Sequence, residues 1–148
     1  VFAKEPLPRL SESPAFFRCK LCMFHTVCHG MAFPKANCRT CAFSTPGEDG
    51  SWRCEHKKQS LSLEDQRQGC GDHIVIPPLM PCPVHNIADN CPCYETPDGL
   101  LSNVPEGAPY PEGTMGFSSR ELALLDISQL PAVIKVKQTL GGVVREAP

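Results

Sequence analysis

Cysteine is the residue whose number and spacing in this chain could do chemistry. Ten cysteines stand among 148 residues, and two pairs, Cys19/Cys22 and Cys38/Cys41, have the spacing C-x-x-C. This spacing aims two sulfurs at one point, which suits tetrahedral metal coordination with metal–sulfur bonds of about 2.3 Å. Two such pairs without a secretory leader favour metal binding, and a disulfide-linked secreted domain is the alternative.

The most complete group follows the pattern C-x2-C-x12-C-x15-C. It consists of Cys38, Cys41, Cys54 and Cys70, within about 33 residues. Four thiolates are the ligands of a structural zinc site and leave no open position for a catalytic water. We therefore expect a zinc-ribbon-like site whose binding energy supports folding. A redox role for the C-x-x-C pair would need a thioredoxin-type βαβ pattern, which the sequence lacks.

A second group, Cys19, Cys22 and Cys28, offers three thiols where a tetrahedral site needs four ligands. His25 or His29 could complete a zinc site with three sulfurs and one nitrogen. The other alternative is a fourth ligand outside this chain. The sequence alone leaves both open.

A third group lies in "CPVHNIADNCPC". Its members are Cys82, His85, Cys91 and Cys93. They could supply four metal ligands, although Pro83 and Pro92 restrict the backbone beside the cysteines. Free thiols or a single disulfide are the alternatives.

Short elements must position these groups, because the chain contains 16 prolines and 11 glycines. Residues 1–14 are expected to form an extended lead-in, followed by two helical turns that end at Gly30 and bury Phe24 with Val27. In the four-cysteine segment we expect a turn at 44–51 and a return strand that brings Cys54 back to the C-x-x-C pair. A short helix follows, with Ser62 as its N-cap and Gly69 at its end.

The second half of the chain is dominated by proline. Residues 74–81 begin as a buried strand that proline stops, and residues 77–116 hold nine prolines and four glycines, so we expect mostly loop. Ser118 and Glu121 form a capping-box pattern ahead of a helix. A second helix is expected from Pro131 to Gly141, followed by a closing strand at 143–146.

The predicted fold class is a small, metal-stabilised, irregular α+β protein. It is a zinc-ribbon-like module with short helices and a proline-rich loop segment. The predicted segments are 1–30 (lead-in and three-cysteine staple), 31–78 (four-cysteine ribbon), 79–116 (loop region) and 117–148 (helical segment).

Charge is distributed unevenly along the chain. Residues 1–58 carry nine Lys/Arg against five Asp/Glu, and residues 59–148 carry five against eleven, which gives +4 and −6 and sums to the net charge of −2. Basic residues alternate with aromatic ones in the first half, as in grooves that track nucleic acid. The predicted nucleic-acid contacts are Arg18, Lys20, Lys35, Arg39, Lys57 and Lys58. The alternative is that the aromatic residues form a small core and the cations are simply solvated.

Five blocks of the sequence resemble a known family. They are "PRLSESPAFFRCKLCMFHTVCHG", "NCRTCAFSTP", "GSWRCEHKK", "QRQGCGDHIVIPPL" and "GFSSREL". In combination they resemble the C-terminal part of phage-encoded PD-(D/E)XK exonucleases of the RecB-like superfamily. The resemblance covers about residues 8–78, with a weaker echo at 116–122.

The resemblance implies a role for the three-cysteine group. Iron-staple nucleases of this superfamily carry C-x2-C-x5-C after the nuclease core and a fourth cysteine before it, and together these hold a [4Fe–4S] cluster. Cys19, Cys22 and Cys28 match the three downstream ligands, so the fourth would lie upstream of this chain. Such a cluster would cross-link the two ends of the catalytic domain.

The catalytic core of that family is missing from the sequence. Glu55 and Lys57 have the Glu-x-Lys spacing, with Asp49 upstream, but they fall in a narrow ribbon. Cleavage with two metal ions needs carboxylates and a lysine that converge on one site. We interpret these residues as an ordinary solvated turn and predict no catalytic residue.

The function expected from these observations is a metal-binding C-terminal module of a phage DNA exonuclease. It would staple the nuclease fold and assist DNA binding, with DNA and the upstream nuclease domain as partners, in the host cell cytoplasm. A stand-alone zinc-binding protein-interaction module is the alternative. No run approaches the roughly twenty apolar residues of a membrane span. Because the chain starts without methionine or a leader, we expect a fragment without a signal peptide.

Overall fold

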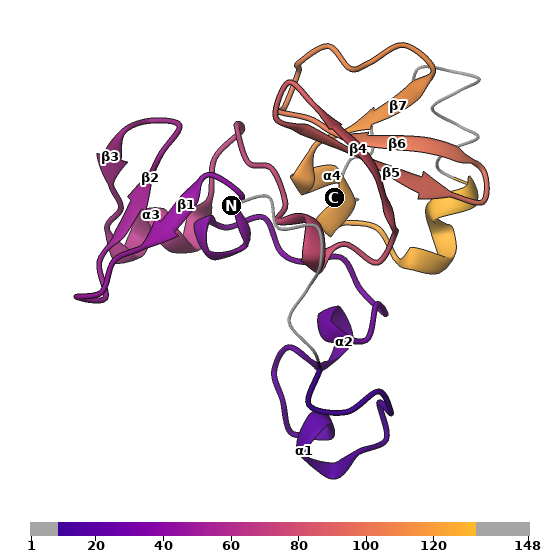
Figure 1. Ribbon diagram of the computed structural model, residues 1–148, viewed down its shortest axis with the longest axis horizontal. Coiled ribbons are helices and arrows are strands. Elements are labelled where there is room, and N and C mark those ends of the chain that lie inside the picture. Colours follow the sequence, from indigo (N-terminus) through magenta and orange to yellow (C-terminus); the bar gives the residue numbers. More distant parts are fainter. Residues whose placement is uncertain (1–8, 133–148) are drawn as a thin grey trace, which may run out of the picture.

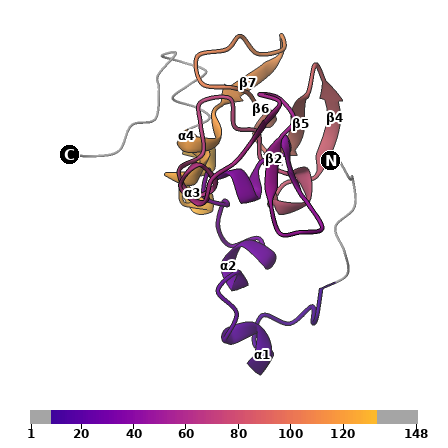
Figure 2. The same ribbon diagram turned by 90° about the vertical axis from the view of Figure 1, so that its left-hand side faces the viewer.

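The computed structural model describes residues 9–132 and shows a small mixed α+β protein with short helices and two sheets (Figure 1). Three parts follow one another along the chain: the arm (residues 9–31), the ribbon (residues 32–76) and the sheet unit (residues 77–132). The arm projects away from the other two parts in both views (Figures 1 and 2). No helix among the described residues is long and apolar enough to cross a membrane.

The arm carries two helices of four residues each, α1 (Phe17–Lys20) and α2 (His25–Cys28). The helix expected before Gly30 is present but shorter than predicted, and Gly30 follows it with a φ of +66°. The expected inward face is wrong, because Phe24 is 63% exposed. Apolar spacing buries a side chain only where another element covers that face, and Phe24 lacks such cover.

The ribbon is a three-stranded antiparallel sheet in the order β1-β2-β3. Its strands are β1 (Ser44–Pro46), β2 (Trp52–Cys54) and β3 (Gln59–Ser60), preceded by the 3-10 helix η1 (Cys38–Thr40). The predicted return strand is confirmed as β2, which places Cys54 opposite Ser44.

Helix α3 (Leu63–Gln68) closes the ribbon, as predicted. The Asp65 amide donates to Ser62 Oγ at 3.1 Å, and the Ser62 amide donates to Asp65 Oδ2 at 2.9 Å, which completes a capping box. Gly69 ends the helix with a φ of +65°. The chain therefore turns sharply just before Cys70.

The buried strand predicted after Cys70 is reduced to a single bridge. Val75 pairs with Cys41 in an isolated antiparallel bridge, and both Ile74 and Val75 are fully buried. The 3-10 helix η2 (Pro77–Leu79) follows at once. Proline does stop the strand, but earlier than the apolar run suggested.

The loop expected over residues 79–116 is wrong. A four-stranded sheet occupies this region in the order β4-β5-β6-β7, with β7 parallel to β6 and the other neighbours antiparallel. The strands are β4 (Val84–Ala88), β5 (Cys91–Thr96), β6 (Gly99–Asn103) and β7 (Thr114–Phe117). Several prolines lie between strands rather than within them, so they shape the turns without breaking the sheet.

Helix α4 (Ser119–Ala123) packs beside this sheet and is followed by the 3-10 helix η3 (Ile127–Gln129). The predicted capping box is confirmed, because the Ser118 amide donates to Glu121 Oε2 at 2.7 Å and the Glu121 amide donates to Ser118 Oγ at 3.2 Å. The helix expected from Pro131 and the closing strand lie largely or wholly outside the described residues.

The main core lies in the sheet unit and reaches into the ribbon. Its buried members are Phe33, Val75, Met80, Tyr94, Leu101, Met115, Phe117, Leu122, Leu125 and Leu130. No residue of the arm belongs to this cluster. Burial of this apolar surface is the main stabilising contribution of the sheet unit.

Candidate metal centre

Four cysteines from three segments of the ribbon lie in one neighbourhood. Cys38 opens η1 and Cys41 follows it, Cys54 ends β2, and Cys70 follows α3. The first three are buried, with 5–8% of their surface exposed, and Cys70 is half-buried. The pairing of β1 with β2 and the turn at Gly69 bring the later two cysteines back to the first pair.

Electrostatic interactions show that these four thiols share one neighbourhood. Burial raises the pKa of Cys38, and Cys41, Cys70 and Cys54 raise it further. Burial likewise raises the pKa of Cys41, with additional contributions from Cys70 and Cys54. The neighbouring ionised sulfurs thus disfavour ionisation of Cys38 and Cys41, and a nearby cation would relieve this repulsion.

Hydrogen-bond donors around the sulfurs act in the opposite direction. Backbone hydrogen bonds from Ile74 and Phe43 lower the pKa of Cys41. The Lys57 amide donates to Cys54 Sγ at 3.4 Å. The Lys57 side chain lies beside Cys70, which is the main cause of the raised pKa of Lys57. Donors of this kind favour the thiolate form that binds metal.

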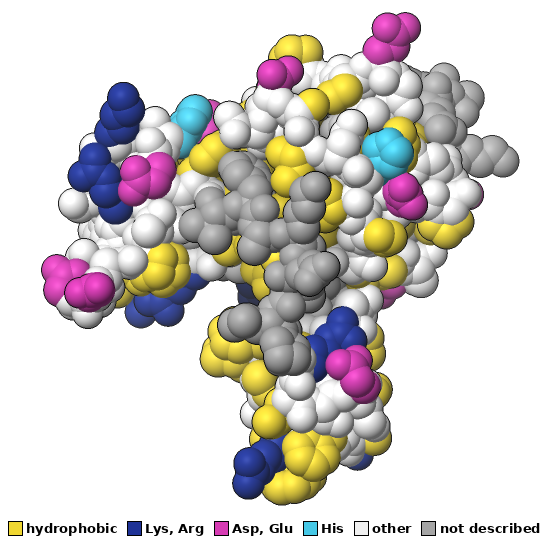
Figure 3. All heavy atoms as spheres, viewed as in Figure 1, with side chains coloured by type: hydrophobic (Ala, Val, Ile, Leu, Met, Phe, Trp, Pro, Cys, Tyr) yellow, Lys and Arg dark blue, Asp and Glu magenta, His cyan; other side chains and the backbone are white. Residues whose placement is uncertain are grey.

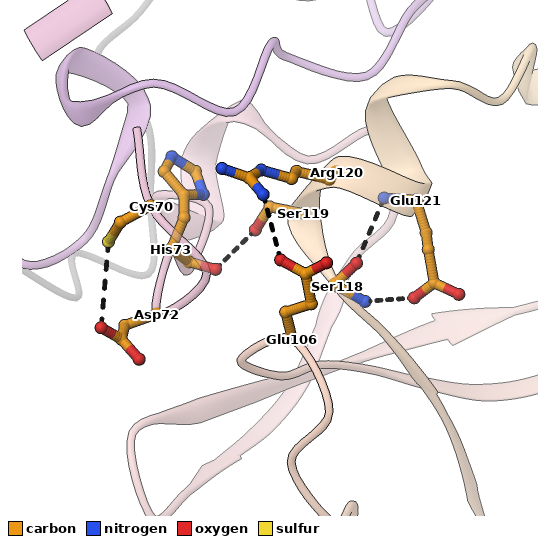
Figure 4. A network of polar contacts seen from close by, with 8 residues as sticks. All are labelled: Cys70, Asp72, His73, Glu106, Ser118, Ser119, Arg120 and Glu121. Carbon is orange, nitrogen blue, oxygen red and sulfur yellow. Dashed lines mark hydrogen bonds and ion pairs between the residues drawn. The ribbon is translucent and has the colours of Figure 1, made fainter. Parts of the chain in front are cut away.

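The sulfurs do not converge on a single point. Cys38 Sγ donates to the Asp65 carbonyl at 3.3 Å, and Cys70 Sγ lies 4.0 Å from Asp72 Oδ2 (Figure 4). Over residues 9–132, no group of three or more His, Cys, Asp or Glu side chains is arranged to hold a metal ion. All ten cysteines are free. The four thiols are therefore neighbours without being a closed coordination sphere or a disulfide pair.

The three cysteines of the arm differ from one another in exposure. Cys19 is buried, whereas Cys22 and Cys28 are exposed. The His25 ring lies 5.1 Å from the His29 ring, and His25 Nε2 is hydrogen-bonded to the Pro14 carbonyl at 2.9 Å. These contacts do not choose between the two histidines as a fourth ligand, so the metal prediction for this group stays a prediction.

The third group is divided between the interior and the surface of the sheet unit. Cys93 is buried and hydrogen-bonds Ser102 Oγ at 2.8 Å. Burial raises the pKa of Cys82, and burial with Asp89 and Cys93 raises that of Cys91. The imidazole of His85 meets Glu95 Oε1 at 2.9 Å. Each member has a local neighbour, and the prediction of a metal at this group also stays a prediction.

The predicted nucleic-acid contacts occupy two separate places. Arg18 and Lys20 lie on α1 in the projecting arm, and the other four lie in the ribbon (Figure 1). In the ribbon, the Arg39 guanidinium donates to Gln66 Oε1 at 3.3 Å, and Lys57 forms an ion pair with Asp72 at 3.3 Å.

Lys35 and Lys58 are exposed and form no ion pair with a residue of the described part. Together with Arg67, which is also exposed and forms no ion pair within the described part, they are the ribbon cations with the least internal compensation. Phosphate binding in the ribbon would therefore depend on them most.

The residues with Glu-x-Lys spacing form local contacts. Glu55 pairs with Arg53 at 3.6 Å, and Asp49 Oδ1 accepts from the Ser51 amide at 3.0 Å within its turn. Both carboxylates are exposed. This environment fits the solvated turn inferred from the sequence.

Sequence reasoning missed the polar residues that connect the ribbon to the sheet unit. Asn103 and Ser119 are buried, and they hydrogen-bond backbone groups of the segment that follows Cys70. Their type gave no signal, because Asn and Ser are common in turns and at helix starts. Only the tertiary fold brings them to this segment.

Comparison with known proteins gives no match to a family model, a curated protein or a solved structure. The resemblance to phage exonucleases therefore rests on the sequence blocks alone.

Proposed function

We propose that this chain is a non-catalytic module in which Cys38, Cys41, Cys54 and Cys70 hold one structural zinc ion. The supporting observation is the gathering of four thiols from separate segments within electrostatic reach of one another. Four thiolates around Zn²⁺ carry a net charge of about −2, which the adjacent Lys57 and the backbone donors offset. Metal binding would draw the sulfurs together from the positions described above.

The ribbon also needs such a staple. Its strands are two or three residues long, and the main core reaches into it only through Phe33 and Val75. Small units of this kind rarely fold on apolar burial alone, and metal binding supplies folding energy directly.

Metal analysis of variants tests this site. The protein is expected to carry zinc at the four thiols, and Cys38→Ser or Cys54→Ser should lose that zinc and unfold the ribbon. Ser62→Ala, which removes the N-cap of α3 in the ribbon without removing a thiol, is the control and should keep it. Zinc content and far-UV circular dichroism that stay unchanged in both cysteine variants would refute the proposal.

The module serves a phage DNA exonuclease, in which it staples the nuclease fold and assists DNA binding. This part of the proposal is supported by the resembling sequence blocks and by the exposed Lys35 and Lys58. Cys19, Cys22 and Cys28 supply three of the four thiolates that a [4Fe–4S] cluster needs. In this proposal the fourth thiolate comes from the nuclease domain of the parent enzyme, as the resemblance implies.

DNA binding is tested by charge reversal at a single lysine. Lys58→Glu should weaken binding to single-stranded DNA and lower the salt dependence by about one phosphate contact. Arg9→Glu changes the net charge equally, but Arg9 is already paired with Glu12 at 3.3 Å, so binding should change little. Binding that is absent at low salt, or equally weakened in both variants, contradicts this role.

The absence of a catalytic centre is tested by assaying cleavage. The chain should show no magnesium-dependent nuclease activity, because Asp49 and Glu55 are exposed and each contacts a local partner. Robust cleavage that disappears in Glu55→Ala would overturn this expectation.

One observation favours a second function, a protein-interaction module. Six of the nine large apolar side chains that are exposed in the described part belong to the arm: Leu10, Phe17, Leu21, Met23, Phe24 and Met31. Hydrophobic side chains also gather on the arm in the space-filling view (Figure 3). Exposed apolar patches are typical of protein interfaces. A chain that holds zinc but fails to bind single-stranded DNA would favour this function.

A further inference from the structure

Residues 70–76, here called the strap, are the last segment of the ribbon and contact the sheet unit. On the ribbon side, Val75 forms the bridge with Cys41, and the Ala42 amide donates to the Ile74 carbonyl at 2.8 Å. The Ile76 amide donates to the Thr40 carbonyl at 2.9 Å. The strap is therefore paired with the segment that carries the C-x-x-C cysteines, and it begins at the fourth cysteine.

The same strap is bound to the sheet unit on its other side. The Val75 amide donates to Asn103 Oδ1 at 2.7 Å, and Ser119 Oγ donates to the His73 carbonyl at 2.8 Å (Figure 4). The Glu106 amide donates to the Gly71 carbonyl at 2.8 Å. These three bonds reach the strap from β6, from α4 and from the segment after β6.

Asn103 and Ser119 join these bonds into one network. Asn103 Nδ2 donates to the Phe117 carbonyl and to Ser119 Oγ, each at 3.1 Å. Asn103 is fully buried and Ser119 is 2% exposed. Their strap partners Val75 and His73 are also buried, so loss of one of these bonds leaves a desolvated polar group and weakens the rest. The network therefore connects the strap to β6, β7 and α4.

We infer that the strap couples metal binding at the ribbon to the stability of the four-stranded sheet, with Asn103 and Ser119 as positioning residues. The inference rests on the proposed zinc site. Metal fixes the strap through its first residue, Cys70, and through Cys41, which pairs with Val75. Loss of metal frees both points, so the bonds to Asn103 and Ser119 weaken and the β6–β7 edge opens. The module then responds to zinc depletion as a whole.

Hydrogen exchange of the full chain, with and without a zinc chelator, measures this coupling. Chelation should speed exchange at the Val104 amide, which donates to the Phe117 carbonyl, by about tenfold, a size typical of coupled sites. The β4–β5 turn at Asp89 and Asn90 lies outside the network and should change little. In Ser119→Ala the acceleration at Val104 should fall to about threefold or less.

Two variants separate coupling from simple destabilisation. Ser119→Thr keeps the hydroxyl and should restore the wild-type response. Ser118→Ala removes the N-cap of the same helix without removing a bond to the strap, so it should destabilise α4 and leave the response to chelation intact. The coupling is reciprocal, so Ser119→Ala should also weaken zinc affinity. The expected loss of affinity equals the factor by which the variant reduces the acceleration of exchange at the Val104 amide.

The outcomes distinguish this inference from the proposed function. Zinc that binds, with ribbon amides that respond to chelation while Val104 does not, overturns the coupling and leaves the zinc site in place. An equal loss of response in Ser118→Ala and Ser119→Ala also overturns it, since general destabilisation would then explain both. A chain that binds no zinc at the four cysteines refutes the proposed site and the coupling together.

Discussion

Gly69 allows the chain to turn from α3 directly into Cys70. Its φ is +65°, and a Cβ at this position would lie 2.7 Å from the Ala36 carbonyl oxygen. A side chain therefore brings both left-handed strain and a backbone clash at this residue. The clash falls on the segment that leads into Cys38, so the geometry of the four-cysteine group depends on this glycine.

Gly69→Ala should destabilise the protein by about 2 kcal/mol or more, because strain and clash add. Gly50 provides a matched control, since its φ of +82° imposes similar strain while a Cβ there meets nothing within 4 Å. Gly50→Ala should cost about 1 kcal/mol. Urea unfolding of the two variants measures the difference, and equal costs would contradict a specific role for the approach to Ala36.

Tyr94 is a buried residue whose ionisation opposes folding at high pH, in addition to the buried thiols. Its side chain is fully buried, and its hydroxyl has no hydrogen-bond partner among the described residues. Burial, with smaller contributions from Cys82 and Cys93, raises the pKa of Tyr94. The unfolded chain releases the phenol proton near pH 10, before the folded protein does. The contribution of this phenol to stability is therefore full below about pH 10 and is lost as the pH rises above it.

Tyr94→Phe should flatten this alkaline loss of stability. At neutral pH the variant should be at least as stable as the wild type, because it removes a buried hydroxyl that lacks a partner. Thermal unfolding between pH 8 and about pH 11 tests the slope. Tyr110→Phe is the control, since Tyr110 is 56% exposed, and it should leave the slope unchanged. The prediction is wrong if both variants behave alike.

At the scale of elements, the sequence predicted those parts of the fold that local chemistry decides. Ser62 and Ser118 predict the starts of α3 and α4, because a capping box satisfies backbone donors within four residues of sequence. The return strand β2 could also be predicted, since it is joined to β1 by a short polar turn. Prediction failed where the paired strands are far apart in the sequence. For example, β7 pairs with β6 in parallel although residues 104–113 separate the two strands. Proline content was a misleading guide there.

Two turn signals for the missed sheet were nevertheless present. Asp89 and Asn90 have φ values of +49° and +61° and connect Ala88 to Cys91, as in a two-residue hairpin with a type I′ turn. The run Pro97-Asp98-Gly99 is a turn signal of the same strength, and it joins β5 to β6. The first turn follows the pairs Ala88 with Cys91 and Ile87 with Pro92, and the second follows Tyr94 with Leu101 two pairs away. Weighed against the proline count, these turns would have predicted hairpins.

Substitutions at Asn90 in the β4–β5 turn should change stability in opposite directions. Asn90→Gly should stabilise the protein by a few tenths of a kcal/mol, because glycine adopts the positive φ without strain. Asn90→Val should cost about 1 kcal/mol or more, because a β-branched side chain is disfavoured there. Denaturant midpoints of the pair test the turn, and a neutral effect of valine would show that the turn contributes little.

The sequence indicated which cysteines form the candidate site, but it did not indicate what they contact in the fold. Spacing alone selected Cys38, Cys41, Cys54 and Cys70, because C-x-x-C pairs report local geometry. It did not indicate that Lys57 lies beside Cys70, or that Cys41 is tied through Val75 to the sheet. Such contacts depend on how separate elements dock, and no pattern within one element specifies that.

At the scale of the whole molecule, the ribbon and the sheet unit share a core that excludes the arm. Phe33 and Val75 pack with the side chains of the sheet unit, and the strap adds buried hydrogen bonds across the same boundary. The arm instead exposes Leu21 and Met23, at 85% and 87%. The molecule thus combines one cohesive body with a projecting segment whose apolar surface faces solvent.

Deletion of residues 1–31 should leave the body folded and the zinc content at the four ribbon cysteines unchanged. The reason is that the core begins with Phe33 and that none of the four cysteines of the proposed zinc site precedes Cys38. Calorimetry and metal analysis of the shortened chain test this division. Phe33→Ala in the full chain is the contrasting variant and should cost about 3–5 kcal/mol, because it opens a cavity in the shared core. If the deletion destabilises the protein as strongly as Phe33→Ala does, then the arm is part of the cohesive body and its exposed side chains contribute to folding rather than to binding.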